Sequence, residues 1–221
     1  MELDGSIHET FVADSDPPVR GVLHRAADGS DAIVLTHGAG SNADAPLLRA
    51  LARAFAAGGM TVLRCDLPFR QARASGPPSP AGAERDRRGL AAALAAMAAR
   101  GVRRCFLGGH SYGGRQASML IADAPSVARG LLLLSYPLHP PGKPERRRIE
   151  HLPRLRVPTL FVHGARDPFG TEEEIEAARA LIPATTSLMM LPRAAHALHA
   201  DATTARAIVT AFRALAGDAD A

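Results

Sequence analysis

The chain has 221 residues, of which 47% are hydrophobic and 22% charged, and its formal net charge at pH 7 is +4. Such a composition is that of an ordinary globular protein, and the length fits one well-buried domain over residues 1–221 better than two. The positive charge comes almost entirely from scattered arginines, and with no Trp and two Tyr the chain offers few aromatic platforms for bases, so we expect no nucleic-acid partner.

No targeting or membrane segment is visible in the sequence. Met1–Ser6 contain acidic residues and no apolar stretch of the kind found in a signal peptide, and no apolar run is long enough to span a bilayer. Cys65 and Cys105 each lie in or beside an apolar, strand-like run, which is typical of free thiols in a reducing compartment. We therefore expect a cytoplasmic protein that does not bind membranes.

Short β-type runs alternate with helical patterns along the chain. In the first half, a hairpin precedes alternating strands and helices, predicted at Thr10–Val12, Val19–Leu23, Ile33–Leu35, Pro46–Ala57, Thr61–Leu63 and around Leu90–Met97. In the second half, strands are predicted at Cys105–Leu107, Leu131–Leu134, Leu160–Val162 and Leu188–Leu191, with helices from Gly114 to about Ala122, at Glu172–Leu181 and at Thr203–Leu215.

Strands that are apolar throughout and separated by helices predict a mostly parallel central sheet with helices on both faces. In such a sheet, functional residues gather in the loops at the carboxyl ends of the strands. Two Pro/Gly-rich stretches, Gly76–Pro80 and Pro140–Pro144, follow strands and are predicted to form the rim of a site rather than domain boundaries.

The motif with the clearest chemical meaning is Gly109-His110-Ser111-Tyr112-Gly113, between a predicted strand and a predicted helix. Glycines two residues before and after the serine fit a strand–turn–helix that is too tight for side chains. The turn would place the Ser111 hydroxyl at a helix N-terminus, where free backbone N–H groups favour developing negative charge. Ser111 is therefore the predicted nucleophile, and His110 is predicted to be structural.

A serine nucleophile needs a base, and the base needs an acid that orients it. Asp167 and His196 each follow a later predicted strand, so the order is Ser, Asp, His. Asp167 has the alternative role of capping the helix near Thr171 or pairing with Arg166. His199 competes with His196, but we place it on the loop or at the start of the last helix.

A tetrahedral intermediate also needs two fixed hydrogen-bond donors for its oxyanion. The backbone N–H of Tyr112 is the predicted first donor because it directly follows the nucleophile. The second is predicted in the small-residue loop after Ile33–Leu35, with Ala39 as first choice and Gly40 as second.

Other residues in these loops are candidates for substrate binding or for organising the loops. His37, Gly38, Tyr136 and His139 are candidate substrate contacts, although His37, like His163, could instead organise its loop. Arg115 is expected to pack or pair locally. Lys143 and Arg146–Arg148 are expected to form a solvated rim loop, with binding of an acidic substrate or partner as the alternative. We expect no metal and no cofactor.

From His37-Gly38 through Ser111 and Asp167 to His196, the chain resembles small serine hydrolases of the α/β-hydrolase superfamily, similar to dienelactone-hydrolase-like esterases. The resemblance implies the α/β-hydrolase fold, with Ser111 as nucleophile, His196 as general base and then acid, and Asp167 as the orienting carboxylate. Dienelactone hydrolase itself uses a cysteine nucleophile, so its lactone specificity is not implied. The segments Pro137–Pro144 and Gly164–Gly170 are also similar to a poorly characterised branch of small hydrolase-like proteins.

The predicted reaction is hydrolysis of carboxylic esters. The interval His139–Val157, where many hydrolases carry a lid domain, is too short for one, and this favours small or short-acyl esters. Two alternatives remain: a non-catalytic interaction module that binds through Pro137–Arg148, and a thioesterase or peptidase with the same triad. An aspartate nucleophile, as dehalogenases and epoxide hydrolases require, is absent from position 111. The sequence does not indicate the oligomeric state.

Overall fold

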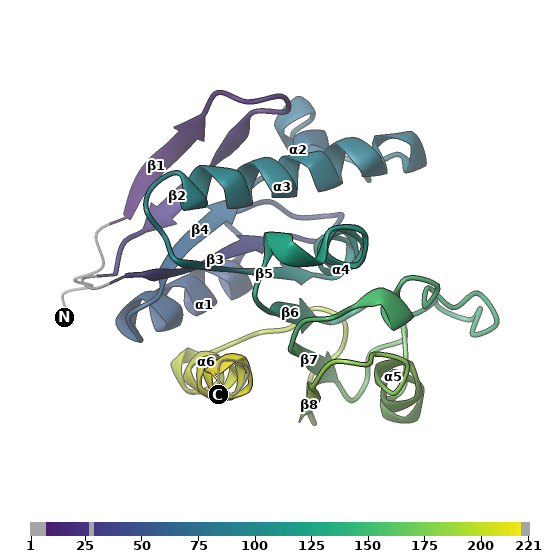
Figure 1. The fold of residues 1–221 in the computed structure, drawn as a ribbon. Coiled ribbons are helices and arrows are strands. Elements are labelled where there is room, and N and C mark those ends of the chain that lie inside the picture. Colours follow the sequence, from purple (N-terminus) through teal and green to yellow (C-terminus); the bar gives the residue numbers. More distant parts are fainter. Residues whose placement is uncertain (1–7, 27–28, 218–221) are drawn as a thin grey trace.

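The computed structural model describes residues 8–26 and 29–217, and its strands form one eight-stranded sheet (Figure 1). The strands are β1 (His8–Ala13), β2 (Val19–His24), β3 (Asp31–Thr36), β4 (Thr61–Cys65), β5 (Arg104–His110), β6 (Leu131–Leu134), β7 (Thr159–Gly164) and β8 (Thr186–Leu191). Their order across the sheet is β1-β2-β4-β3-β5-β6-β7-β8. Met1–Ser6, in which we expect no signal peptide, lie outside the described residues.

The sheet is parallel from β4 to β8 and antiparallel at one edge. β1 pairs with β2 as the predicted hairpin, and β2 joins β4 in antiparallel register. The predicted mostly parallel sheet is confirmed. Because β3, β5, β6, β7 and β8 run in one direction, the loops that follow them lie along the same edge; in the register, for example, Thr36 stands opposite Gly109.

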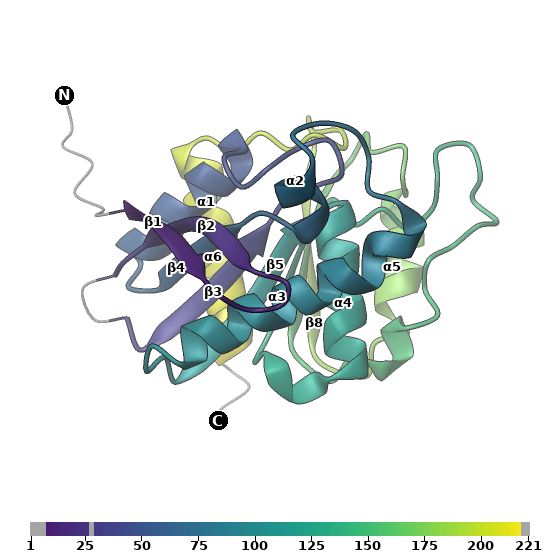
Figure 2. The same ribbon diagram turned by 90° about the horizontal axis from the view of Figure 1, so that it is seen from above.

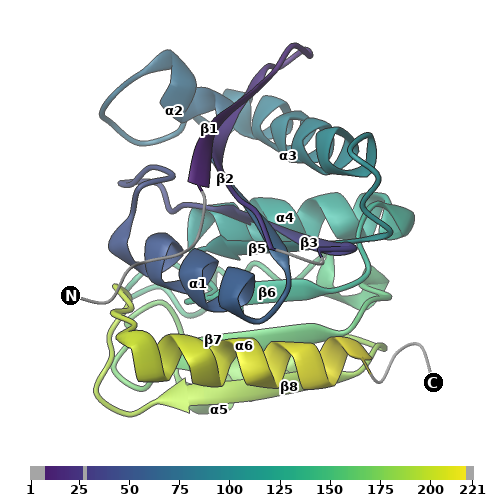
Figure 3. The ribbon, with the colours of Figure 1, turned by 90° about the vertical axis from the view of Figure 1, so that its left-hand side faces the viewer.

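Helices cover both faces of the sheet, as predicted. On one face lie α1 (Pro46–Ala57) and α6 (Ala202–Gly217), side by side in Figure 3. On the other lie α3 (Ala83–Ala98), α4 (Tyr112–Asp123) and α5 (Glu172–Arg179), and Figure 2 shows α3 next to α4. Each group of helices buries its own hydrophobic cluster against the sheet.

The sequence explains why these elements form where they do. β3 and β6 are buried on both faces and consist almost wholly of aliphatic residues. In α1, the buried Leu47, Leu48, Leu51 and Phe55 recur at helical spacing, and Pro46 occupies the first turn, where its missing N–H is not needed. At α5, Thr171 and Glu174 form a reciprocal capping box.

Several elements differ from the prediction. The short helix α2 (Pro68–Ala72) and the single-turn helices η1 (Pro80–Gly82), η2 (Pro125–Val127) and η3 (Leu152–Arg154) carry no periodic signal because they are so short. The helix predicted to reach Leu181 ends at Arg179, three residues before Ile182, whose backbone is restricted by the following Pro183. Between β6 and β7 only η3 is formed, so no lid covers the sheet edge.

Candidate active site

Ser111 occupies the sharp turn between β5 and α4. Its φ of 50° and ψ of −117° put it in a region that side-chain-bearing residues rarely adopt. The backbone N–H of Ser111 donates to the Leu134 carbonyl at 2.8 Å, which ties the turn to the neighbouring strand β6. The strained turn is therefore held by the sheet itself.

The glycines around Ser111 are required by close backbone approach. A Cβ on Gly109 would lie 2.5 Å from the Gly114 nitrogen, and a Cβ on Gly113 would overlap the His37 carbonyl oxygen. Gly114, outside the predicted motif, is equally confined, with a Cβ position 2.6 Å from the Gly109 oxygen. Strand β5, helix α4 and the loop after β3 thus meet at distances that only glycine allows.

The three residues predicted as a triad lie in a continuous hydrogen-bonded row. The Ser111 Oγ is 2.7 Å from the Nε2 of His196. On the other side of the ring, Nδ1 lies 3.0 Å and 2.9 Å from the two carboxylate oxygens of Asp167. With the Nδ1 proton donated to Asp167, Nε2 is free to accept the hydroxyl proton of Ser111.

Asp167 is held as a carboxylate by its surroundings. Burial alone would raise its pKa, but the hydrogen bonds from His196 and from the Phe169 backbone N–H, together with the nearby imidazoles of His196 and His163, outweigh burial and lower the pKa. Because Asp167 is 6% exposed, this charge acts in a poorly solvated place. The predicted alternative partner Arg166 instead donates to the Arg193 carbonyl.

The ring of His196 is fixed by two aromatic neighbours. Phe169 stacks on it with ring centroids 4.0 Å apart, and the His110 ring centroid lies at 5.5 Å. The His110 Nε2–H donates to the His196 carbonyl oxygen at 3.0 Å. Burial lowers the pKa of His110, which favours the neutral ring. His110 therefore positions the loop that carries His196, as well as lining the cavity described below.

The competing His199 is exposed and does not reach Ser111. Together with His196 it forms an H-x-x-H pair in the sequence. Within residues 8–26 and 29–217, however, no group of three or more His, Cys, Asp or Glu side chains could hold a metal ion.

Two chain segments supply candidate oxyanion donors beside Ser111. Tyr112 is the first residue of α4, so its backbone N–H has no acceptor within the helix. Ala39 and Gly40 lie in the loop after β3, and both line the same cavity as Ser111. We call residues Gly38–Ser41 the oxyanion loop.

The oxyanion loop is held by Arg70, which the sequence analysis did not single out. The Arg70 guanidinium donates to the Ala39 carbonyl oxygen at 2.8 Å and to the Ser41 carbonyl oxygen at 2.8 Å, and it also reaches the carbonyls of Arg73 and Gly76. The side chain is 8% exposed. Arg70 occupies the carbonyl groups of this loop and so fixes the orientation of its peptide planes.

Tyr112 is anchored by a second residue that the sequence did not reveal. Its phenol O–H donates to Asp86 Oδ2 at 2.7 Å, and Asp86 Oδ1 accepts the Phe69 backbone N–H at 3.0 Å. Asp86 is fully buried. Burial raises the pKa of its carboxyl, against the opposing effect of these two hydrogen bonds. The carboxylate joins α3, the start of α2 and the first residue of α4.

Of the four predicted substrate contacts, only Gly38 lines the cavity beside Ser111. His37 is fully buried, and its ring bonds the Gly38 carbonyl and the Leu67 N–H. Tyr136 is 1% exposed and donates to the Arg148 carbonyl. His139 binds Glu174 of α5. The structure does not bring these three side chains to the cavity, because their polar atoms bond other segments of the chain.

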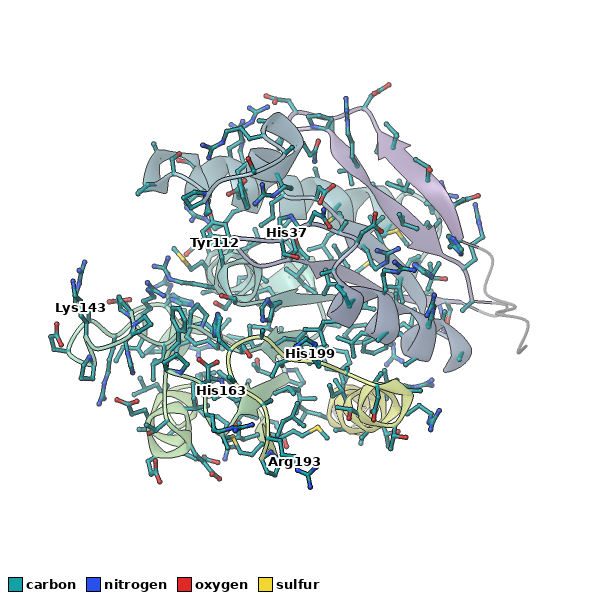
Figure 4. The ribbon with its side chains drawn as sticks, turned by 180° about the vertical axis from the view of Figure 1, so that it is seen from behind. His37, Tyr112, Lys143, His163, Arg193 and His199 are labelled. Atoms are coloured by element: carbon teal, nitrogen blue, oxygen red, sulfur yellow. The ribbon has the colours of Figure 1, made fainter. Side chains whose placement is uncertain are left out.

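A cavity of about 790 Å³ opens beside Ser111 and His196. The predicted rim loop after β4 contributes Pro77–Pro80, and Met119 of α4 and Phe169 add apolar surface. The second predicted rim loop, Pro140–Pro144, contributes nothing to the lining; Lys143 lies on a loop that projects away from the sheet (Figure 4). Arg87, Arg115 and Arg148 line the cavity as well.

Comparison with known proteins gives the same type of fold. The model of a family described as an alpha/beta hydrolase domain matches residues 29–216. Similar solved structures include a dienelactone hydrolase from Anabaena variabilis, with 18% identity, 95% of this chain and 96% of that chain covered, and a TM-score of 0.75. An alpha-beta serine hydrolase homologue from Coxiella burnetii has 16% identity, 95% and 96% coverage, and a TM-score of 0.71. The esterase domain of a Rhodothermus marinus protein has 16% identity, 94% and 97% coverage, and a TM-score of 0.71.

None of the helices in the described part of the chain is both long and apolar enough to cross a bilayer.

Proposed function

Because this chain belongs to the alpha/beta hydrolase family, we propose that it hydrolyses small or short-acyl carboxylic esters through a covalent acyl-Ser111 intermediate. The observation that carries the proposal is the row Ser111–His196–Asp167, with a hydroxyl-to-imidazole distance of 2.7 Å and imidazole-to-carboxylate distances of 3.0 and 2.9 Å. The similarity to a structure described as an esterase domain supports the choice of an ester substrate.

In the first step, the Nε2 atom of His196 takes the proton of the Ser111 hydroxyl while Oγ attacks the ester carbonyl carbon. Throughout, the Asp167 carboxylate accepts a hydrogen bond from the Nδ1–H of His196, which keeps the needed tautomer and stabilises the imidazolium that forms. His196 then gives its Nε2 proton to the leaving alcohol, and the bond between the carbonyl carbon and the alcohol oxygen breaks.

The negative charge that develops on the carbonyl oxygen needs donors that are already in place. We assign this role to the backbone N–H groups of Tyr112 and Ala39, with Gly40 as the alternative second donor. The N-terminus of the twelve-residue helix α4 adds a favourable dipole at the same point. Removing one oxyanion donor typically lowers kcat by about 10²-fold to 10³-fold.

The second half of the reaction repeats the first with water. His196 removes a proton from water, the hydroxide attacks the acyl carbon, and Ser111 leaves with the proton that His196 returns. These steps use only the triad, the oxyanion donors and water.

The size of the substrate follows from the surroundings of the cavity. The segment between β6 and β7 forms only η3, so no lid domain covers the cavity. A long acyl chain bound there would remain largely uncovered. We therefore expect kcat/KM to be highest for short acyl esters; a strong preference for long-chain esters would contradict this part of the proposal.

The deciding experiment is labelling with a fluorophosphonate probe, comparing the wild type with Ser111→Ala and His196→Gln. We expect one labelled residue, mapped by mass spectrometry to Ser111, with labelling absent in Ser111→Ala and much slower in His196→Gln. Thermal melting of each variant establishes that it is folded. Folded wild-type protein that remains unlabelled and hydrolyses no ester would overturn the proposal and favour a non-catalytic interaction module.

A further inference from the structure

Three arginines from different parts of the chain surround the cavity beside Ser111. Arg87 comes from α3, Arg115 from the first turns of α4, and Arg148 from the segment between β6 and β7. All three are half-buried. Among the described residues that line this cavity there is no aspartate, glutamate or lysine. The cavity wall therefore combines three positive charges with no negative one.

These arginines have few partners within the protein. Arg87 donates to the Gln116 side-chain oxygen at 3.1 Å, and Arg148 donates to the Pro137 carbonyl at 2.9 Å. The Nε atom of Arg115 is buried without any hydrogen-bond partner. In the described part of the chain, none of the three forms an ion pair. A guanidinium has five N–H donors, so most remain available.

Some arginines elsewhere on the molecule form ion pairs. Arg154 pairs with Asp123 at 2.8 Å, and Arg179 pairs with Glu176. Those pairs are partly or fully exposed and need no further explanation. In contrast, a buried, unpartnered guanidinium N–H is unfavourable unless something binds it. The difference points to a group that the cavity receives rather than to ordinary surface solvation.

The arginines are also fixed relative to the nucleophile. Arg115 lies one turn beyond Ser111 on the same helix, and its backbone N–H donates to the Ser111 carbonyl at 3.0 Å. The buried Tyr136 donates its hydroxyl to the Arg148 carbonyl at 2.6 Å. Arg115 and Arg148 line the same cavity, and burial together with the charge of Arg115 lowers the pKa of Arg148. A bound anion would offset their mutual repulsion.

We infer that the substrate carries an anionic group, a carboxylate or a phosphate, which Arg115 and Arg148 bind, with Arg87 beside them, while its ester carbonyl lies at Ser111. This inference rests on the proposed function, because it names the class of ester on which the Ser111 site acts. Arg115 and Arg148 are then specificity-determining residues: a guanidinium matches the paired oxygens of either anion, and charge-assisted hydrogen bonds are stronger than neutral ones.

The test uses two pairs of esters in which only the charge differs. One pair is mono-para-nitrophenyl glutarate and its neutral methyl ester. The charged member of this pair carries its carboxylate on the acyl side. The other is para-acetoxybenzoate and its methyl ester, in which the charge is on the leaving group. We expect kcat/KM to favour the charged member of at least one pair by about 10-fold or more, the range expected for a hydrogen bond to a charged group.

The variants separate the arginine pocket from the reaction centre. Arg115→Gln and Arg148→Gln are each expected to lower the ratio of charged to neutral kcat/KM by about 10-fold, and Arg115→Lys to retain part of the preference. The matched control is Arg85→Gln. Arg85 lies on the same helix as Arg87 but outside the cavity, and its Nη1 atom is 3.4 Å from Oδ1 of Asp16. Arg85→Gln should leave both kcat/KM values unchanged.

Failure of this inference is distinguishable from failure of the proposed function. If the neutral esters are hydrolysed with full dependence on Ser111, but the charged members gain nothing and the arginine variants leave the ratio unchanged, the anion pocket is wrong and the esterase stands. If no ester is hydrolysed, titration calorimetry with glutarate and with phenyl phosphate decides. If either anion binds and Arg115→Gln weakens that binding, the pocket is supported. If neither glutarate nor phenyl phosphate binds, the pocket is overturned. The anion that binds more tightly identifies the group as carboxylate or phosphate.

Discussion

The two sides of the cavity differ in how completely their polar groups are paired. On the reaction side, Ser111, His196 and Asp167 bond one another, and Arg70 and Asp86 bond the segments that carry the proposed oxyanion donors. On the arginine side, Arg115 has a buried Nε without a partner and, among the described residues, forms no ion pair. The polar groups of the reaction side are paired within the protein, whereas those of the arginine side find their full set of partners only when a ligand binds.

This difference is what catalysis and recognition each demand. A reaction centre works best when its donors and acceptors are oriented before the substrate arrives, because no reorganisation is then needed in the transition state. A recognition surface must keep its donors available for the substrate, which leaves them unsatisfied in the free protein. We therefore expect substitutions on the reaction side to lower activity and often stability, whereas substitutions on the arginine side should affect specificity.

The largest expected effect comes from disrupting the hydrogen bonds that join Ser111, His196 and Asp167. Asp167→Asn should lower kcat for a neutral ester by about 10⁴-fold, because the amide no longer fixes the Nδ1 proton of His196. The measurement is steady-state hydrolysis with thermal melting as a check on folding. The matched control is Glu174→Gln, which alters a second histidine–carboxylate contact, His139 Nε2 to Glu174 Oε2 at 3.1 Å, outside the cavity. Equal losses in both variants would contradict the assigned role of Asp167.

A smaller effect is expected from loosening the oxyanion loop. Arg70→Lys keeps the charge but cannot reproduce four carbonyl contacts, so we expect kcat to fall by about 10²-fold, as when one oxyanion donor is lost, with KM little changed. Arg73→Lys is the control, because Arg73 donates to the Pro77 carbonyl rather than to the oxyanion loop. A loss that appears only in KM would mean that Arg70 shapes the substrate pocket instead of the donors.

The glycines of the nucleophile turn provide a test of stability. In Gly113→Ala the new methyl group overlaps the His37 carbonyl oxygen, so the free energy of unfolding should fall by about 1–3 kcal/mol. In Gly40→Ala nothing lies within 4 Å of the new Cβ, and we expect a change of less than about 0.5 kcal/mol. Urea unfolding of both variants gives the comparison, and equal values would contradict the close approach.

The sequence predicted the fold and three residues that the structure brings together because both leave local signals. Apolar strands separated by helices specify a covered parallel sheet, and the glycines around Ser111 mark a turn that a larger residue would block. Asp167 and His196 could be identified because each lies in the loop after a strand, and the carboxyl ends of parallel strands share one edge. Their chemical roles remain the proposal made above.

What the sequence did not reveal depends on contacts between distant segments. Arg70 lies 31 residues from Ala39 in the chain, and Asp86 lies 26 residues from Tyr112; neither has a motif around it. His37, Tyr136 and His139 resembled substrate contacts because they are polar residues close to strand ends. Position along a strand does not tell whether a ring turns toward the cavity or toward a neighbouring loop, and only packing decides that.

A pH series sharpens the contrast between two carboxylates on the reaction side. The pKa of Asp86 is raised, chiefly by burial, so the native state binds its proton more tightly than the unfolded state does. The free energy of unfolding should therefore fall as pH rises from the ordinary carboxyl pKa through the raised one. Asp86→Asn should remove this fall, because an amide does not titrate. The Asn side chain can still accept the Phe69 backbone N–H and form a hydrogen bond with the Tyr112 hydroxyl. Asp167, with a lowered pKa, contributes the opposite slope at lower pH. An unchanged profile in Asp86→Asn would mean that Asp86 titrates normally.

The smallest expected effect has the opposite sign from those on the reaction side. Arg115→Met keeps an unbranched aliphatic chain to cover its surroundings but removes a buried, unpartnered N–H and one of the positive charges that line the cavity. We expect the free energy of unfolding to stay the same or to rise by up to about 1 kcal/mol, because residues held for binding are often unfavourable for stability. Arg70→Met, which removes a guanidinium bonded to four carbonyls, should lower it clearly. If urea unfolding instead gives similar losses for both, Arg115 is a structural arginine like Arg70, and the two sides of the cavity do not differ in the way described.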